Sequence, residues 1–329
     1  MPTNSPTSHS LPEWLRAHGE PLFSAQLRTE PADFQVTELL GWEMSGDGEH
    51  DYLYIEKTGA NTDWVAEQLA SFAGVPAKEV GYAGLKDRHA VTWQWFSVPR
   101  WHSPDWSGLA IEGVRVLDVK RHLRKLRRGA HDGNQFRILL RHDNPLDREA
   151  VQGRLATIGE RGVPNYFGEQ RFGRNGNNLR LAEDWANGRR LSRNKRSLAI
   201  SVARSWLFNN ALSHRVEAQT WNQLVAGDKA NLEGSASIFD VPEVDAELSA
   251  RCHTMDIHPA GTLAGDGTAM GPERWQTAFQ RGRVEPGSRS LRLRVADLEG
   301  KFTDAGLELN FTLTRGAFAT SVLRELCIW

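Results

Sequence analysis

Strand-like segments near both ends of the chain, separated by a long block of different character, constrain the fold most strongly. Apolar and polar residues alternate in segments 34–40 and 51–59, and this period of two is typical of β-strands. The same periodicity returns near the C-terminus, in 289–302 and 306–315. Strands at both ends with a helix- and loop-rich block between them predict an α+β protein that carries an inserted domain.

Local signals place further elements in the N-terminal half. Asn61 and Thr62 are good N-caps for a helix that ends at Gly74, and Asp147 caps a second helix. Two more segments have strand character, and they flank a strongly basic stretch; they cover residues 114–119 and 134–141.

The character of the sequence changes at about Gly162. An irregular Gly/Asn-rich loop over 165–178 is followed by a long amphipathic helix over 198–219. Mostly loop-like, acidic sequence is expected from there to about Pro286. These changes predict a catalytic domain in two parts, 1–161 and 288–329, interrupted by an inserted domain at 162–287.

Composition excludes several classes of protein. With 40% hydrophobic and 25% charged residues, the 329-residue chain is not mainly disordered. Its apolar stretches are shorter than the roughly 18 residues of a membrane helix, so no membrane association is expected. Cys252 and Cys327 are too few for a disulfide framework, and we expect a reducing cytoplasm.

Positive charge is concentrated in two tracts, although the net charge is only -1. Residues 114–141 contain nine Lys/Arg against two Asp, and residues 161–196 contain nine against three acidic residues. Such tracts on an otherwise acidic chain indicate either a polyanion-binding surface or two solvated basic faces, and the pattern alone leaves both open.

Several familiar motifs are absent or incomplete. The glycine-rich segment 265–271 lacks the G-x-G-x-x-G spacing and reads as a surface loop. His253 and His258 have no third ligand in view, so no metal site is expected. The sequence contains no G-x-S-x-G and therefore gives no support to a serine hydrolase.

The segment GYAGLKDRHAVTWQW, which begins at Gly81, is the strongest candidate for chemistry. Asp87 lies between Lys86 and Arg88, after a glycine loop and before an apolar strand. Nearby cations would favour an ionised carboxylate, which can act as a nucleophile or a general base. In an extended K-D-R the two basic side chains point away from Asp87, and a surface ion pair is the alternative.

Six motifs in order give the chain a resemblance to a known family. The segment around Asp87 resembles the signature A-G-x-K-D-x-x-A-x-T-x-Q of the TruD family of tRNA pseudouridine synthases. Five other segments match further motifs of that family: PADFQVTE (31–38), GNQF (133–136), VPNYFGEQRFG (163–173), NKRSLAISVARSWLFN (194–209) and GAFATSVLREL (316–326).

The resemblance implies a fold, an activity and a partner. The fold would be a permuted pseudouridine synthase core with a mixed, mainly antiparallel sheet and an inserted TRUD domain. The activity would be isomerisation of uridine to pseudouridine in transfer RNA, at position 13 in characterised bacterial members, without a cofactor or a metal. Transfer RNA would be the partner, and we expect a monomer with no obligate protein partner.

The resemblance also assigns roles to individual residues. Asp87 matches the catalytic position, whereas Phe34, Asn134 and Phe318 match positions that line the substrate pocket. Arg28 is the candidate partner of the catalytic aspartate. The target base must leave the helical stack, and whether Asp87 attacks C1′, attacks C6 or abstracts a proton stays open.

Two other classes of function are alternatives to a pseudouridine synthase. An inactive RNA-binding relative that acts as a tRNA chaperone is disfavoured by the intact motif around Asp87. An aspartate-dependent glycosidase requires two carboxylates that flank one bond, and no acidic partner is visible near Asp87 in the sequence.

Overall fold

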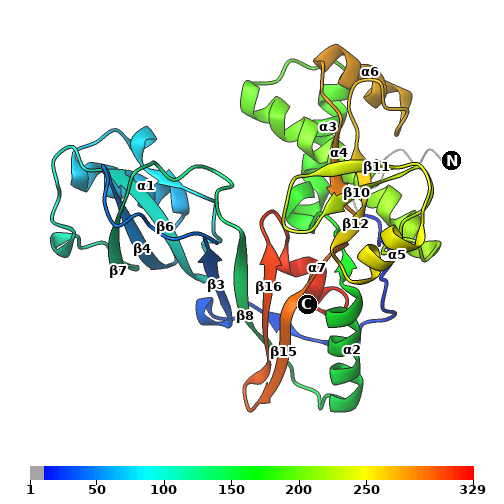
Figure 1. Cartoon of the computed structure of the whole chain (residues 1–329), viewed down its shortest axis with the longest axis horizontal. Coiled ribbons are helices and arrows are strands. Elements are labelled where there is room, and N and C mark those ends of the chain that lie inside the picture. Colours follow the sequence, from blue (N-terminus) through cyan, green and yellow to red (C-terminus); the bar gives the residue numbers. More distant parts are fainter. Residues whose placement is uncertain (1–10) are drawn as a thin grey trace. The chain divides into compact units, whose positions relative to one another are not determined.

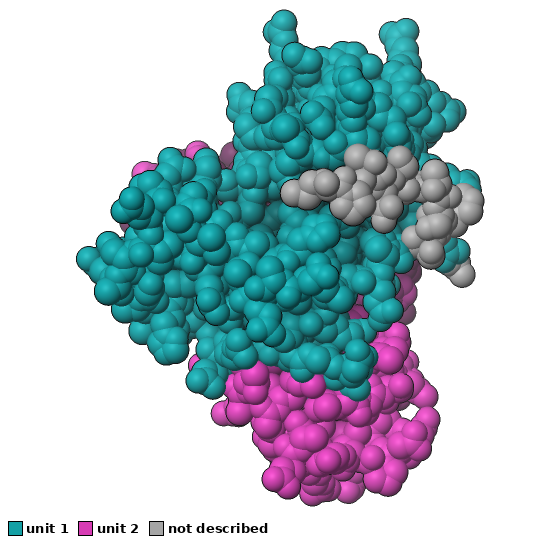
Figure 2. Space-filling model, turned by 90° about the vertical axis from the view of Figure 1, so that its right-hand side faces the viewer, with its two compact units in different colours: residues 1–21, 160–294, 317–326 teal, residues 22–159, 295–316, 327–329 magenta. Residues whose placement is uncertain are grey.

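The computed structural model describes residues 11–329, which divide into two compact units (Figure 2). The sheet unit comprises residues 22–159, 295–316 and 327–329, and the helical unit contains residues 160–294 and 317–326 together with the described part of 1–21. The domain boundaries expected after residues 161 and 287 stay a prediction, since a compact unit is not the same thing as a family domain.

A nine-stranded sheet forms the framework of the sheet unit (Figure 1). Neighbouring strands along its main path are β15 (Ala296–Thr303), β16 (Gly306–Thr314), β8 (Gly133–Arg141), β3 (Phe34–Leu39), β6 (Val91–Pro99), β4 (His50–Thr58) and β7 (Val114–His122). The short strands β2 (Gln26–Leu27) and β5 (Gly81–Tyr82) pair with β8 and β6. All of these pairs are antiparallel except β3–β6.

Strands from both ends of the sequence therefore share this sheet. Strand β16 pairs with β8 along eight residues, and β8 in turn pairs with β3. The predicted α+β class with a mixed, mainly antiparallel sheet is confirmed. A separate parallel pair joins β1 (Phe23–Ser24) to β17 (Cys327–Ile328).

Helix α1 (Thr62–Ala73) covers part of one face of the sheet. Its apolar residues recur at helical spacing, and Val65 and Leu69 are buried against Ile55 of β4 and Phe96 of β6. Gly74 ends the helix with a φ of 67°, a left-handed conformation that glycine adopts without strain. The sheet unit also contains most of α2 (Arg148–Arg161), and the Asp147 side chain accepts a hydrogen bond from the Ala150 N–H.

The helical unit is built around α4 (Arg193–Glu217), which begins five residues earlier than the sequence predicts. Buried residues of α4 such as Phe208 and Leu212 belong to one core with Trp185 of α3 (Asn177–Ala186) and with Trp275 and Phe279 of α6 (Glu273–Gly282). The unit also contains α7 (Ala319–Leu323) and the short antiparallel pair of β9 (Val163–Pro164) and β14 (Arg292–Leu293).

The expectation of a loop-like segment up to Pro286 is wrong. This stretch contains α5 (Ala246–His253), α6 and three strands, β10 (Asp228–Leu232), β11 (Ile238–Val241) and β12 (Ile257–Leu263). With β13 (Gly287–Ser290), which follows directly, these strands form an antiparallel sheet in the order β11, β10, β12, β13. Pro259 interrupts the strand pattern, because proline has no N–H for the hydrogen-bond ladder. It is accommodated in β12, where its carbonyl accepts a hydrogen bond from the Leu291 N–H at 2.8 Å.

Candidate active site

The loop between β5 and β6 carries Asp87 and is held at several backbone positions. The Lys86 N–H donates to Oγ1 of Thr62 at 2.9 Å, and Nε2 of Gln94 donates to the Gly84 carbonyl at 3.3 Å. Thr62 and Gln94 are buried and are themselves joined by a 3.0 Å hydrogen bond. Residues of α1 and β6 thus fix the loop at two positions just before Asp87.

The carboxylate of Asp87 has a defined partner at each oxygen. Nη2 of Arg28 lies 2.8 Å from Oδ2, and the His89 N–H donates to Oδ1 at 3.0 Å. The Asp87 side chain keeps 26% of its surface exposed, and that of Arg28 keeps 22%. The carboxylate is therefore oriented by the protein and still accessible from outside.

Arg28 is positioned by an unusual backbone conformation and by an aromatic ring. Its φ of 61° is left-handed, and its guanidinium carbon lies 4.1 Å from the centre of the Phe34 ring. Burial lowers the pKa of Arg28, while the charge of Asp87 acts in the opposite direction. Phe34 is buried, and its ring contacts Phe136 edge to face and the guanidinium of Arg28.

A second layer of charged residues lies behind this pair, and Lys57 and Glu38 in it are not among the candidates expected from the sequence. Lys57 is fully buried, and its Nζ donates to the carbonyls of Ala60 at 2.8 Å and Asp87 at 3.1 Å. Burial lowers the pKa of Lys57 to about 8. Nζ of Lys86 lies 2.8 Å from Oε2 of Glu38, and both side chains are almost entirely buried.

One sequence signal could have identified Lys57. It follows Leu53 and Ile55 at a spacing of two on β4, so the alternation that buries these apolar residues also points Lys57 inward. A lysine in such a position needs hydrogen-bond acceptors, because an unpaired charge in the interior is costly.

Asn134 lies on β8 opposite Glu38 of β3. Its Oδ1 is buried and has no hydrogen-bond partner in the described structure, and the same holds for Nδ1 of the buried His131. Burial lowers the pKa of His131, and the charge of Lys86 adds to this effect. A buried polar atom without a partner costs stability, so these two atoms are candidates for contacts with a bound molecule.

Phe318 belongs to the helical unit, unlike the other candidate residues. It is the N-cap residue of α7, is partly exposed, and lines a pocket of about 200 Å³ within that unit. The structure thus brings Arg28, Phe34 and Asp87 into contact, places Asn134 beside Glu38, and leaves Phe318 in the other compact unit.

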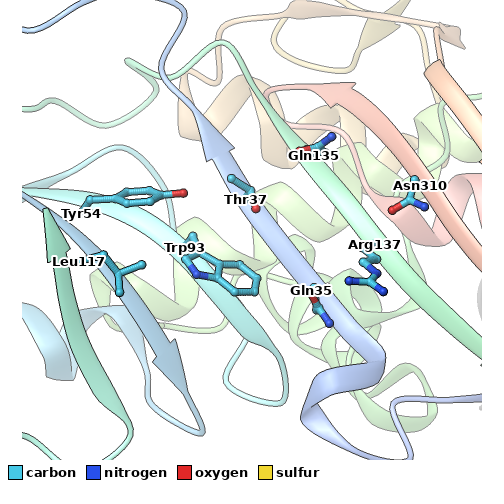
Figure 3. Close-up of a pocket in the computed structure, with 8 residues that line it drawn as sticks. All are labelled: Gln35, Thr37, Tyr54, Trp93, Leu117, Gln135, Arg137 and Asn310. Atoms are coloured by element: carbon cyan, nitrogen blue, oxygen red, sulfur yellow. The ribbon is translucent and has the colours of Figure 1, made fainter.

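A pocket of about 330 Å³ lies on the sheet (Figure 3), and Asp87 is not among its lining residues. Gln35 and Thr37 line it, and they alternate along β3 with Phe34, Val36 and Glu38. It therefore opens on the opposite face of the sheet from Phe34. The other lining residues come from five neighbouring strands: Tyr54, Trp93, Leu117, Gln135, Arg137 and Asn310.

Residues 11–329 contain neither a metal-binding cluster nor a membrane-spanning helix. No group of three or more His, Cys, Asp or Glu side chains in this range is arranged to hold a metal ion. No helix in this range has the length and apolar content to cross a membrane.

Comparison with known proteins gives consistent matches. A sequence profile of the family described as tRNA pseudouridine synthase D (TruD) matches residues 16–183. Curated proteins of that name from Methylococcus capsulatus and Hydrogenovibrio crunogenus are 46% and 41% identical; the alignments cover 98% of this chain and 97% and 98% of theirs. A solved structure from Methanosarcina mazei, described as a putative tRNA pseudouridine synthase D, superposes with a TM-score of 0.69 at 20% sequence identity. The superposition covers 94% of this chain and 95% of that one, which shows a similar fold.

Proposed function

This chain belongs to the TruD family of tRNA pseudouridine synthases, and we propose that Asp87 carries the reaction by which it isomerises uridine to pseudouridine in transfer RNA. One observation supports a catalytic role for Asp87: its carboxylate is oriented by Arg28 and the His89 N–H yet remains partly exposed. Catalytic groups need this combination of fixed geometry and access to the substrate.

The reaction conserves all atoms of the uridine. The N1–C1′ bond breaks, the base rotates, and a C5–C1′ bond forms; the proton on C5 is lost and N1 gains one. An ionised carboxylate can serve as a nucleophile toward C1′ or C6, or as the base that removes the C5 proton. Its oxygens are presented by Arg28, which is itself held by the Phe34 ring.

The substrate base must first leave its helical stack. Asn134 is a candidate for reading the edge of the flipped uracil, because its buried Oδ1 has no hydrogen-bond partner in the described structure. An acceptor there suits the N3–H of uracil, and a bound base would remove the cost of leaving that oxygen unpaired. Phe318 is the proposed stacking surface, in keeping with its partial exposure.

We propose position 13 of transfer RNA as the target. Purified protein should be incubated with a tRNA transcript that lacks pseudouridine, and the product should be mapped by chemical labelling. Pseudouridine is expected at position 13, and a transcript with cytidine there serves as the matched control. A product at another position, or none from the wild-type chain, would overturn this proposal.

A further inference from the structure

The pocket beside Phe318 has a polar and cationic lining. Its residues come from the loop after β9, from α3 and α4, and from the start of α7: Gln170, Arg171, Asn178, Leu198, Phe318 and Thr320. A hydroxyl, two carboxamides and one guanidinium thus surround a hollow of about 200 Å³. Thr, Asn, Gln and Arg side chains are all common ligands of nucleic-acid phosphates.

Arg171 is a partly buried cation that no carboxylate of the described chain neutralises. Its Nη1 donates to Oγ of Ser201 at 3.1 Å, and its buried Nε has no hydrogen-bond partner in the described structure. No ion pair of Arg171 is found among residues 11–329. Burial lowers the pKa of Arg171, which reflects the cost of holding this charge away from water.

A second arginine adds positive charge beside Arg171. Burial and the charge of Arg171 together lower the pKa of Arg289 to about 10. The guanidinium carbons of Arg171 and Arg289 lie 5.7 Å and 4.3 Å from the centre of the same ring, that of Phe167. A bound anion would offset the mutual repulsion and part of the desolvation of these cations.

We propose that this pocket binds a phosphate group of the RNA backbone, with Arg171 as its principal cationic ligand. The proposal rests on the proposed function, because it takes transfer RNA to be the substrate. A guanidinium presents its donors in a fixed fork that matches two phosphate oxygens. A single phosphate group is also small enough for a pocket of this volume.

Leu198 offers a test that spares the interior of the protein. Its side chain lines the pocket but is 36% exposed, so Leu198→Glu should fold and place a carboxylate where the phosphate would bind. Leu198→Gln is the matched neutral control. We expect Leu198→Glu to bind unmodified tRNA roughly tenfold more weakly than Leu198→Gln, since one charge-assisted contact is replaced by repulsion.

Arg171→Gln gives the complementary measurement. It should weaken tRNA binding by roughly tenfold and reduce the log–log salt slope by about one unit, as expected when one phosphate is no longer neutralised. Arg251→Gln is the control, because Arg251 lies in the same unit and already pairs with Asp256 at 2.6 Å. Its affinity and slope should equal those of the wild type.

The outcomes separate this proposal from the proposed function. A wild-type chain that makes pseudouridine, together with equal affinities for Leu198→Glu and Leu198→Gln, would overturn the phosphate site alone. A wild-type chain that binds tRNA but forms no pseudouridine would count against the proposed function, while weakened binding by Leu198→Glu would still support the site. Thermal melting of each variant shows that the folded protein is being compared.

Discussion

Arg28 in the sheet unit and Arg171 in the helical unit are both partly buried arginines, but their partners differ. Arg28 lies 2.8 Å from the Asp87 carboxylate, whereas Arg171 donates to the Ser201 hydroxyl and has no ion pair in the described part of the chain. One arginine orients a carboxylate, and the other leaves a positive charge available for an anion. An arginine therefore supports a catalytic carboxylate in the sheet unit and an anion-binding site in the helical unit.

The surroundings of the two arginines extend this contrast. Near Asp87, the positive charge of Lys86 is matched by Glu38. Near Arg171, the neighbouring cation is Arg289, whose pKa is lowered by burial and by the charge of Arg171. We therefore expect substitutions near Asp87 to alter the rate of the reaction, and substitutions near Arg171 to alter the affinity for tRNA.

Among residues other than Asp87 itself, the largest effect is expected for Arg28→Gln. Loss of the ion pair frees the Asp87 carboxylate, and misplacement of a catalytic group by about 1 Å can cost roughly 100-fold in rate. We therefore expect single-turnover pseudouridine formation to slow by about that factor, with tRNA affinity kept within a few-fold. Arg28→Lys retains the charge and should be less impaired. An affinity loss without a change in rate would assign Arg28 to binding.

A smaller effect is expected for Phe318→Ala. If its ring stacks on the flipped uracil, kcat/KM should fall by about one to two powers of ten, which corresponds to roughly 1–3 kcal/mol of stacking. The side chain is partly exposed, so the melting temperature should change little. A large fall in melting temperature with near-normal activity would show that Phe318 is a packing residue instead.

Lys57 provides a prediction about pH, measured against Lys57→Met. Its pKa is lowered by burial from 10.5 to about 8, so the unfolded chain binds more protons than the folded one between these values. The free energy of unfolding of the wild type relative to Lys57→Met should therefore rise with pH across this range, by up to about 3 kcal/mol. Denaturant titrations at pH 7 and pH 10 measure it; a difference that stays constant would mean that Lys57 titrates normally.

The smallest effects concern the exposed basic tract at residues 120–128. Arg124 and Arg127 form no ion pair in the described structure, whereas Lys125 lies 3.7 Å from Glu79 and Arg128 lies 3.5 Å from Asp63. Replacing all four with Ala should flatten the salt dependence of tRNA binding, by roughly one unit of slope for each phosphate that the tract neutralises in the wild type.

Two double variants divide this effect. Arg124→Ala with Arg127→Ala should account for most of the change, and Lys125→Ala with Arg128→Ala for less, because carboxylates already compensate the second pair. An unchanged slope in the quadruple variant would show that this tract does not contact RNA.

The sequence predicted the parts of the site that depend on local pattern or motif. Asp87 was singled out by its motif and Arg28 by its family position just before residues 31–38, and the helix over 62–74 followed from its cap and its terminal glycine. The contacts of Lys57 with the Asp87 carbonyl and of Lys86 with Glu38 join residues 30 and 48 positions apart. Such contacts depend on strand register, which a single sequence does not specify in advance.

The helical unit was harder to predict for a different reason. Its four-stranded sheet consists of strands of four to seven residues, and the longest of them contains Pro259 and Gly261. Short strands with such residues carry little periodic signal, and tertiary packing decides their conformation. The phosphate pocket depends on the same packing, because its lining comes from segments more than 100 residues apart in sequence.

The central claim is that Asp87 acts in the chemical step and Arg171 in binding. Single-turnover conversion of tRNA at saturating enzyme tests it most directly, with Asp87→Asn and Arg171→Gln measured in parallel and binding determined on the same samples. We predict that Asp87→Asn binds tRNA within a few-fold of the wild type but forms no pseudouridine, whereas Arg171→Gln regains nearly the wild-type rate once saturated. Conversion of bound tRNA by Asp87→Asn at the wild-type rate would contradict this account.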